Sequence, residues 1–179
     1  LINYNIVKQW GKSKDTSISN AKKSLHKMTT NISLVKLLEE VEILLDLKIS
    51  SKKRLFEEIG LCIEEKYGIP RADTFDALFA REKLGSTNIG HGIALPHGRL
   101  SPLKRFVGVF ARLEDPIQFE SGQNKQVKMV FILLTPKAKQ QNQHLAYLAH
   151  LAEVFSNKGT REKLLTTSNS AEIIKLLGE

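Results

Sequence analysis

The sequence predicts a three-layer α/β domain, in which helices cover both faces of a buried sheet. Two segments carry the strand signal. "FVGVFARL" (106–113) has the composition of a strand, and "VKMVFILLT" (127–135) is continuously apolar, as in a strand covered on both faces. Segments with helical periodicity lie before and after these strands. The 179 residues contain no internal repeat, and their number suits a single domain.

Two helices are expected before the strands. The first follows Ser51 and ends at Gly68 and Pro70, which are typical helix-ending residues. The second is expected to be capped by Asp73 and to stop at Gly85. Their apolar faces recur at helical spacing and consist of Leu55, Ile59, Cys62 and Ile63 in the first helix, and Phe75, Leu78 and Phe79 in the second.

The remaining elements follow in order along the chain. A short apolar segment, 93–95, leads into Pro96 and His97. A polar loop rich in Lys and Gln then precedes a helix from about Asn142, and two shorter helical segments follow at 160–166 and 170–177. The expected apolar face of the long helix consists of Leu145, Leu148, Ala149, Ala152 and Phe155.

The net charge of +8 is concentrated at the N-terminus. Residues 1–27 carry six lysines and one aspartate, a net charge of +5, which leaves +3 for the rest of the chain. This segment is polar and lacks helical or strand periodicity, and ordered patterning begins after Met28. We therefore expect a basic, disordered segment at 1–27, or upstream sequence preceding a start at Met28, and a folded domain at 28–179.

Several function classes are disfavoured by composition. The longest strongly apolar run, 129–134, is far shorter than the roughly 20 residues that cross a bilayer, so no membrane insertion is expected. The N-terminus lacks the apolar region of a secretory signal, and Cys62 is the only cysteine, so a cytoplasmic location is predicted and Cys62 is expected in the core. There is no helix-turn-helix signal and no basic stretch interleaved with aromatics, which argues against nucleic-acid binding.

The stretch "GSTNIGHGIALPHGRL" (85–100) is rich in glycine and histidine but fits no common nucleotide motif. Gly85 and Gly90 have P-loop spacing, yet His91 and Gly92 stand where Lys and Ser/Thr are required. A dinucleotide fingerprint fails because Leu95 occupies the position of its third glycine. We therefore expect no nucleotide cofactor.

A metal site is also not expected. His144 and His150 are six residues apart, about 240° around a helix, so they do not share a face. The chain shows no structural zinc spacing.

A nucleophilic histidine remains as an explanation of this stretch. Neutral imidazole is a competent nucleophile near neutral pH and accepts phosphoryl groups. Gly90, Gly92 and Gly98 would let backbone N–H groups approach the phosphoryl oxygens, and Pro96 would stiffen the approach to His97. From chemistry alone, the favoured interpretation of His97 is a strand-end residue hydrogen-bonded to a loop.

The segment "REKLGSTNIGHGIALPHGRL" (81–100) resembles the signature of phosphotransferase-system enzyme IIA proteins of the mannitol/fructose type, and most closely that of their nitrogen-regulatory branch. That pattern reads R-E-K-x-G-S-T-x-I-G-x-G-I-A-x-P-H-G. The resemblance continues through "VGVFARLEDPIQF", "VFILLTP" and "HLAYLAHLAEVF" and covers most of 29–178. It implies an α/β sandwich with a mixed, mainly parallel sheet flanked by helices.

The resemblance also implies roles for three residues. His97, in the P-H-G motif, would accept the phosphoryl group; Arg81, sixteen residues earlier, would neutralise phosphate charge; and His144 would be the second histidine of the active site. The alternatives are an exposed arginine at a helix C-terminus and a solvent-facing histidine in a first turn. His91 replaces the usual asparagine and is expected to face solvent, and His150 is expected to be structural.

The function that follows is that of a phosphocarrier rather than a free-standing turnover enzyme. The donor would be an HPr-like phosphocarrier, and binding to regulatory target proteins would change with phosphorylation state. The alternative within the family is a sugar-specific IIA that passes phosphate to a IIB domain for fructose or mannitol uptake.

Overall fold

The structure is a computed structural model that describes residues 34–122, 125–137 and 141–179. Residues Leu37–Glu179 form one compact unit. The predicted basic segment, 1–27, lies outside the described residues, so the division of the chain at Met28 stays a prediction.

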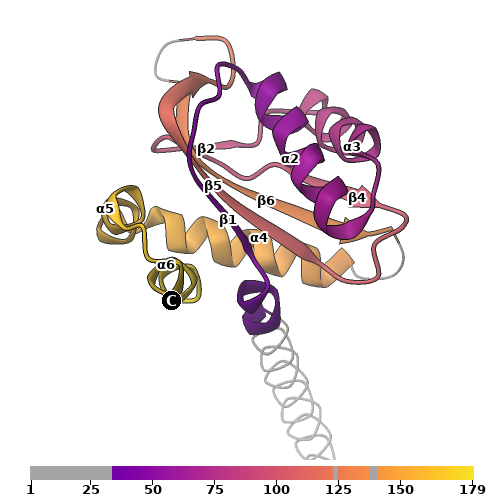
Figure 1. Ribbon diagram of the computed structural model, residues 1–179. Helices are drawn as coiled ribbons and strands as arrows, with labels where there is room; N and C mark the ends of the chain where they lie inside the picture. Colours follow the sequence, from indigo (N-terminus) through magenta and orange to yellow (C-terminus); the bar gives the residue numbers. More distant parts are fainter. Residues whose placement is uncertain (1–33, 123–124, 138–140) are drawn as a thin grey trace, which may run out of the picture. The chain divides into compact units, whose positions relative to one another are not determined.

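A mixed sheet forms the centre of the unit (Figure 1). The strands lie in the order β1-β5-β6-β3-β2. Strand β4 pairs with the same edge of β6 as β3 does, but nearer to the C-terminal end of β6. The pairs β1/β5, β3/β6 and β4/β6 are parallel, whereas β5/β6 and β2/β3 are antiparallel. The predicted mixed sheet is thus confirmed, with three parallel pairs of strands and two antiparallel ones, of which β5/β6 is the longest. The strands are β1 Glu42–Leu47, β2 Asn88–Gly90, β3 Ile93–Ala94, β4 His97–Leu100, β5 Val107–Gln118 and β6 Gln126–Pro136.

Helices cover both faces of this sheet, which confirms the three-layer α/β fold. The pair α2 and α3 lies on one face, and α4 lies on the other, with α5 and α6 beside it (Figure 1). The helices are α2 Lys52–Tyr67, α3 Arg71–Lys83, α4 Gln141–Ser156, α5 Lys158–Thr166 and α6 Ser170–Leu177. None of the described helices is long and apolar enough to cross a membrane.

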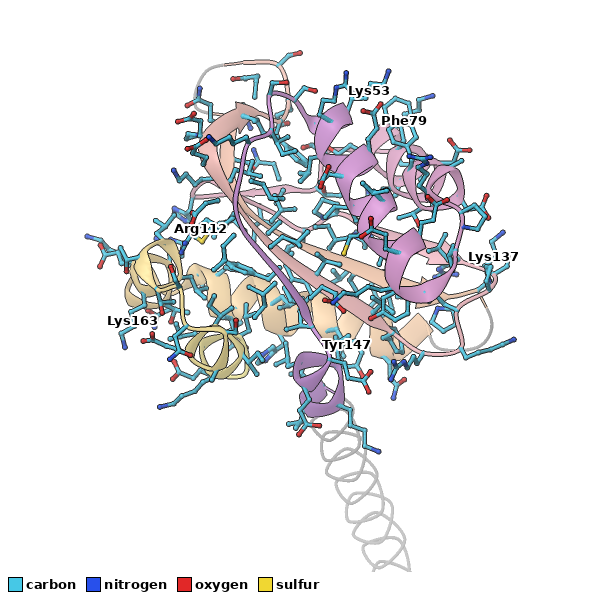
Figure 2. The ribbon with its side chains drawn as sticks, viewed as in Figure 1. Lys53, Phe79, Arg112, Lys137, Tyr147 and Lys163 are labelled. Carbon is cyan, nitrogen blue, oxygen red and sulfur yellow. The ribbon has the colours of Figure 1, made fainter. Side chains whose placement is uncertain are left out.

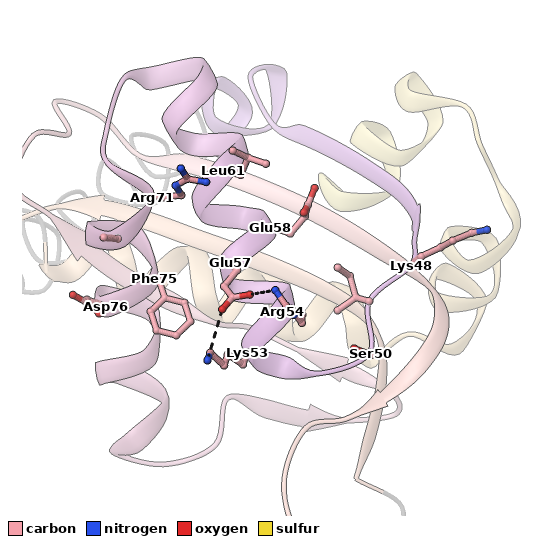
Figure 3. Close-up of a pocket in the computed structure, with 12 residues that line it drawn as sticks. Lys48, Ser50, Lys53, Arg54, Glu57, Glu58, Leu61, Arg71, Phe75 and Asp76 are labelled. Carbon is pink, nitrogen blue, oxygen red and sulfur yellow. Dashed lines mark hydrogen bonds and ion pairs between the residues drawn. The ribbon is translucent and has the colours of Figure 1, made fainter.

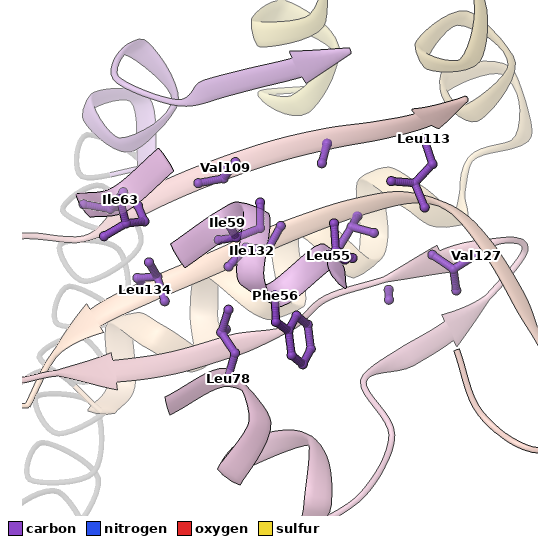
Figure 4. Close-up of a cluster of buried hydrophobic side chains, with 14 of the residues drawn as sticks. Leu55, Phe56, Ile59, Ile63, Leu78, Val109, Leu113, Val127, Ile132 and Leu134 are labelled. Atoms are coloured by element: carbon purple, nitrogen blue, oxygen red, sulfur yellow. The ribbon is translucent and has the colours of Figure 1, made fainter. Parts of the chain in front are cut away.

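Helix α2 supplies the centre of the core (Figure 4). Ser51 caps it by accepting the Arg54 N–H at 3.2 Å, and Gly68 ends it in a left-handed conformation, φ 66°, as predicted. The predicted apolar face packs against alternate residues of β5 and β6. Cys62 is only half-buried, so its expected place in the core is only partly confirmed. The core residues here are Leu55, Phe56, Ile59, Ile63, Val109, Leu113, Ile132 and Leu134.

The predicted start of α3 is wrong. The helix begins at Arg71, directly after Pro70, and Asp73 lies inside its first turn rather than at its cap. Proline has a fixed φ that suits a helix start, and its carbonyl accepts the Asp73 N–H at 3.0 Å. The backbone therefore enters the helix before Asp73 is reached.

The predicted face of α4 is only partly correct. Phe155 is buried as predicted, but Leu145 is 64% exposed and Ala149 is exposed, and the buried residues before Phe155 include His144, Tyr147 and Leu151. Tyr147 lies on the face toward the sheet (Figure 2), with its ring 4.9 Å from that of Phe106. The prediction counted only apolar side chains, but a histidine and a tyrosine occupy two of the buried positions.

A buried arginine joins the sheet to the C-terminal helices. Arg112 of β5, labelled in Figure 2, is 4% exposed and pairs with both oxygens of Asp46, at 3.0 and 3.2 Å. Its Nη1 also donates to the carbonyl oxygens of Leu164 and Thr167. These bonds satisfy the buried charge and fix the connection between α5 and α6.

Candidate functional site

Strand β4 directs its residues alternately to the two faces of the sheet. Gly98 and Leu100 face α3 and the α2 core, so His97 and Arg99 face the side of α4. The register pairs His97 with Leu133 at the buried centre of β6, which fixes the position of the ring. The ring of His144, from α4, lies 5.0 Å from that of His97.

Both ring nitrogens of His97 have hydrogen-bond partners. The Nε of Arg81 donates to His97 Nε2 at 2.8 Å, and His97 Nδ1 lies 2.9 Å from the carbonyl oxygen of Leu95. A guanidinium only donates and a carbonyl only accepts, so Nδ1 carries the proton and Nε2 holds the free electron pair. The hydrogen bonds therefore select one neutral tautomer, with its nucleophilic nitrogen toward Arg81.

Burial lowers the pKa of His97 below its usual value of 6.5. The Leu95 carbonyl opposes this shift by favouring a protonated ring, whereas the positive charge of Arg81 lowers the pKa of His97 further. The pKa of His144 falls further, to about 4, because burial removes it from water and because His97, Arg99 and Arg81 disfavour a second positive charge. Both imidazoles are thus neutral near pH 7.

His144 has an unused polar atom. Its side chain is 7% exposed, and Nδ1 is buried without a hydrogen-bond partner among the described residues. The alternative interpretation, a solvent-facing histidine in the first turn, is therefore wrong. A buried ring nitrogen without a partner costs free energy.

These side chains line an open pocket of about 590 Å³. Five further residues line this pocket that were not predicted from the sequence as site residues: Ala77, Ala80, Leu84, Arg99 and Leu145. Arg99 was detectable because it lies two residues after His97 in a strand, on the same face. Leu84 and Leu145 are 85% and 64% exposed and lie at the end of α3 and the start of α4, beside the pocket.

The three glycines proposed for phosphate binding do not lie together. Gly98 lines the pocket, where a Cβ would approach the Cβ of Ala77 to 3.1 Å, so glycine lets β4 lie against α3. Gly90 and Gly92 are in the β2–β3 hairpin. The Gly92 carbonyl accepts from Lys128 and Met129, so the hairpin is about five residues, roughly 16 Å, along β6 from the partner of His97. The structure therefore supports only Gly98 as part of the site.

The other two histidines of the described chain lie outside the pocket. His91 is exposed at the hairpin turn, as expected. His150 Nε2 lies 2.9 Å from the carbonyl oxygen of Leu177 in α6, which agrees with the expected structural role. Within the described residues, no three His, Cys, Asp or Glu side chains gather as metal ligands would.

A larger pocket, about 780 Å³, lies between α2 and the start of α3 (Figure 3). Its charged side chains partly neutralise one another: Glu57 accepts from Arg54 at 2.9 Å and pairs with Lys53 at 3.9 Å. Among the residues that line it there is no histidine or cysteine that could act as a nucleophile. The smaller pocket around His97 is therefore the candidate active site.

Known proteins are similar over most of this chain. A nitrogen regulatory protein of Bradyrhizobium diazoefficiens is 37% identical over 131 residues, which cover 73% of this chain and 85% of that protein. The crystal structure of the nitrogen regulatory protein IIA-Ntr from Neisseria meningitidis is 44% identical, with a TM-score of 0.73, and the match covers 78% and 97% of the two chains.

A more distant structure supports the fold. It is the complex of the mannitol enzyme IIA with phosphorylated enzyme IIB from Escherichia coli, 21% identical, with a TM-score of 0.62 and coverage of 76% and 93%. Residues 36–179 match the sequence profile described as the phosphoenolpyruvate-dependent sugar phosphotransferase system, EIIA 2. The chain therefore belongs to the EIIA 2 family of this phosphotransferase system.

Proposed function

We propose that this chain is a cytoplasmic phosphocarrier of the nitrogen-related phosphotransferase system, phosphorylated on His97 by an HPr-like donor. The single observation that carries the proposal is the hydrogen-bonded tautomer of His97. A neutral ring with its electron pair on Nε2, beside an arginine and in an open pocket, is suited to phosphoryl transfer. The similarity to nitrogen regulatory proteins supports the choice of branch.

The transfer step needs no separate base. Nε2 of His97 attacks the phosphorus of the donor's phosphohistidine, and the P–N bond of the donor breaks in line. The donor's leaving nitrogen keeps the electron pair of that bond. Positive charge then develops on the His97 ring, where the Nδ1–H bond to the Leu95 carbonyl stabilises it.

Arg81 has to change partners during this step. In the structure it occupies the electron pair that must attack, so the hydrogen bond to Nε2 breaks as the phosphoryl group arrives. The guanidinium then lies beside the new phosphoryl oxygens, to which it donates charge-assisted bonds. His144 lines the same pocket and is neutral near pH 7, so we expect a ring N–H of His144 to donate to another phosphoryl oxygen.

A regulatory function is supported by the change in surface charge that phosphorylation of His97 would cause. Phosphorylation adds roughly −1.5 to −2 charge beside Arg81 and Arg99, between the exposed Leu84 and Leu145. A partner that contacts this pocket meets a cationic, apolar surface in one state and a neutralised one in the other. We propose that target proteins distinguish the two states in this way.

The experiment that tests the acceptor uses enzyme I, an HPr-type carrier and phosphoenolpyruvate. We expect an acid-labile, base-stable phosphohistidine in the native chain and none in His97→Ala. His144→Ala is expected to accept label but to exchange it poorly with partners. Uptake by His97→Ala at the native rate would assign the chemistry to another residue.

The second candidate function is that of a sugar-specific IIA. The family match supports it, because that family is named for sugar phosphotransfer. The two readings differ in the acceptor. Phosphorylated protein should transfer slowly or incompletely to fructose- and mannitol-type IIB domains if the regulatory reading holds. Complete transfer to either domain, as fast as loading from the HPr-type donor, would favour the sugar-specific reading.

A further inference from the structure

The carboxylate of Glu82 lies beside the site but takes no part in the chemistry proposed above. Glu82 follows Arg81 on α3, yet it is buried, 7% exposed. Its Oε1 accepts from Lys52 Nζ at 3.0 Å, and its Oε2 accepts from the backbone N–H of Thr87 at 3.1 Å and from Thr87 Oγ1 at 2.6 Å. Three donors thus satisfy a buried charge that would otherwise be costly.

One chain of hydrogen bonds leads from this carboxylate to Nδ1 of His97. Thr87, 5% exposed, is held by Glu82 through its N–H and its hydroxyl. The carbonyl oxygen of Thr87 accepts the N–H of Leu95 at 2.9 Å. The carbonyl oxygen of Leu95 in turn accepts the Nδ1–H of His97 at 2.9 Å. The orientation of the acceptor that fixes the tautomer thus depends on Thr87.

A second chain leads to Nε2 from the backbone of the loop that this carboxylate closes. The loop between Glu82 and Thr87 contains Gly85, whose N–H donates to the backbone carbonyl of Glu82 at 3.2 Å. The carbonyl oxygen of Gly85 accepts from Nη1 of Arg81 at 2.9 Å, while Nε of Arg81 donates to His97 Nε2 at 2.8 Å. The Glu82 side chain closes this loop by holding its far end at Thr87.

We infer that Glu82 and Thr87 form a positioning pair, which holds the two hydrogen-bond partners of the His97 ring, the Leu95 carbonyl and the Arg81 guanidinium. The inference rests on the proposed function of His97 as phosphoryl acceptor. The pair contacts neither the ring nor the incoming phosphoryl group, so its effect on transfer is exerted through Leu95 and Arg81.

Replacing the carboxylate by an amide disrupts this arrangement for a simple reason. Lys52 Nζ and the Thr87 N–H can only donate, and the amide of Glu82→Gln has a single acceptor oxygen. One donor must then face the amide NH₂. Thr87→Val is milder, because it removes only the hydroxyl bond and keeps the backbone bond and the side-chain shape.

The first measurement is the tautomer of His97, by nitrogen-15 NMR of the full-length protein above pH 7. We expect the native ring to carry its proton on Nδ1, and both Glu82→Gln and Thr87→Val to show a mixture of the two tautomers. This measurement uses no phosphoryl donor, so it stands apart from the proposed function. A native protein that takes no label would refute that function and leave the tautomer result intact.

The second measurement is the rate of phosphoryl uptake from the phosphorylated HPr-type carrier. Each variant should be slower by about tenfold, and Arg81→Ala combined with Glu82→Gln should be slowed by less than the product of the two single effects. Asp46→Asn is the control: it weakens another ion pair, between the exposed Asp46 and the buried Arg112, and should lower stability without changing tautomer or rate.

Two results would overturn the inference. One is an unchanged Nδ1–H tautomer in both Glu82→Gln and Thr87→Val. The other is a double variant whose rate loss equals the product of the single losses, because that would show that Glu82 does not act through Arg81. Thermal melting of each variant establishes that the protein measured is folded.

Discussion

The neutral state of His144 should make the protein less stable in mild acid. In the folded protein the pKa of His144 is about 4, and in the unfolded chain it returns to the ordinary value of 6.5. Between these values the unfolded state binds a proton that the folded state excludes. Stability is therefore unaffected by His144 well above pH 6.5 and is lost as pH falls from 6.5 toward 4.

The magnitude follows from the two pKa values. Each pH unit in this window costs at most about 1.4 kcal/mol for one group, so moving from pH 7 to pH 5 should remove about 2 kcal/mol of the unfolding free energy through His144. Burial is the main physical cause of the lowered pKa, since the ring is only 7% exposed. His97, Arg99 and Arg81 also oppose protonation of His144. His97, whose pKa is also lowered, adds to the loss in the same direction.

The assay is urea unfolding at pH 7 and pH 5, for the native protein and for His144→Gln, which cannot titrate. The difference between the two pH values should be smaller in His144→Gln by about 2 kcal/mol. Val154→Ala is the control: it lies on the buried face of α4 and should lower stability equally at both pH values. The same pH difference in His144→Gln and the native protein would refute the reasoning.

Three further outcomes are expected. Arg81→Ala should slow phosphoryl uptake by about tenfold to a hundredfold, the equivalent of about 1.5–3 kcal/mol for a charge-assisted bond, and Arg81→Lys should recover only part of the rate. Stopped-flow mixing with labelled donor measures both rates, and a native rate in Arg81→Ala would show that Arg81 is not part of the site. Gly98→Ala should lower the unfolding free energy by about 1–3 kcal/mol, because its Cβ would approach Ala77 to 3.1 Å, and Ala77→Gly should restore part of the loss in urea unfolding; an unchanged midpoint would contradict this packing argument. A chain that begins at Met28 should match the full chain in thermal midpoint and phosphoryl uptake, and a drop of several degrees would mean that residues 1–27 stabilise the domain.

The elements predicted best were those in which one local signal dominated. The apolar run 127–135 predicted a strand covered on both faces, and β6 occupies it with one residue more at each end. Ser51 and Gly68 fixed the ends of α2 because cap chemistry acts within one turn of the helix. The resemblance to the IIA signature indicated His97, Arg81 and His144, and the structure brings these three side chains to one pocket.

The strand β1 shows why other elements were not predicted. The sequence "EILLDL" has no alternation of polar and apolar residues and reads as a continuation of the preceding apolar segment. It becomes a strand because β5 offers it a parallel edge and because Arg112 pairs with Asp46. Both contacts join residues more than sixty positions apart in the sequence. A local sequence pattern therefore could not predict them.

The sequence by itself determined the chemistry that this protein presents: a histidine between proline and glycine, an arginine sixteen residues before it, and the apolar segments that place them in an α/β domain. Only the tertiary structure decided which atoms meet. It separated Gly90 and Gly92 from His97, because strand register carries the hairpin along β6. It also turned His144 inward and gave both nitrogens of the His97 ring their partners, Arg81 and the Leu95 carbonyl, since burial and hydrogen-bond partners depend on the packing of α3, α4 and β4 and not on their spacing in the chain.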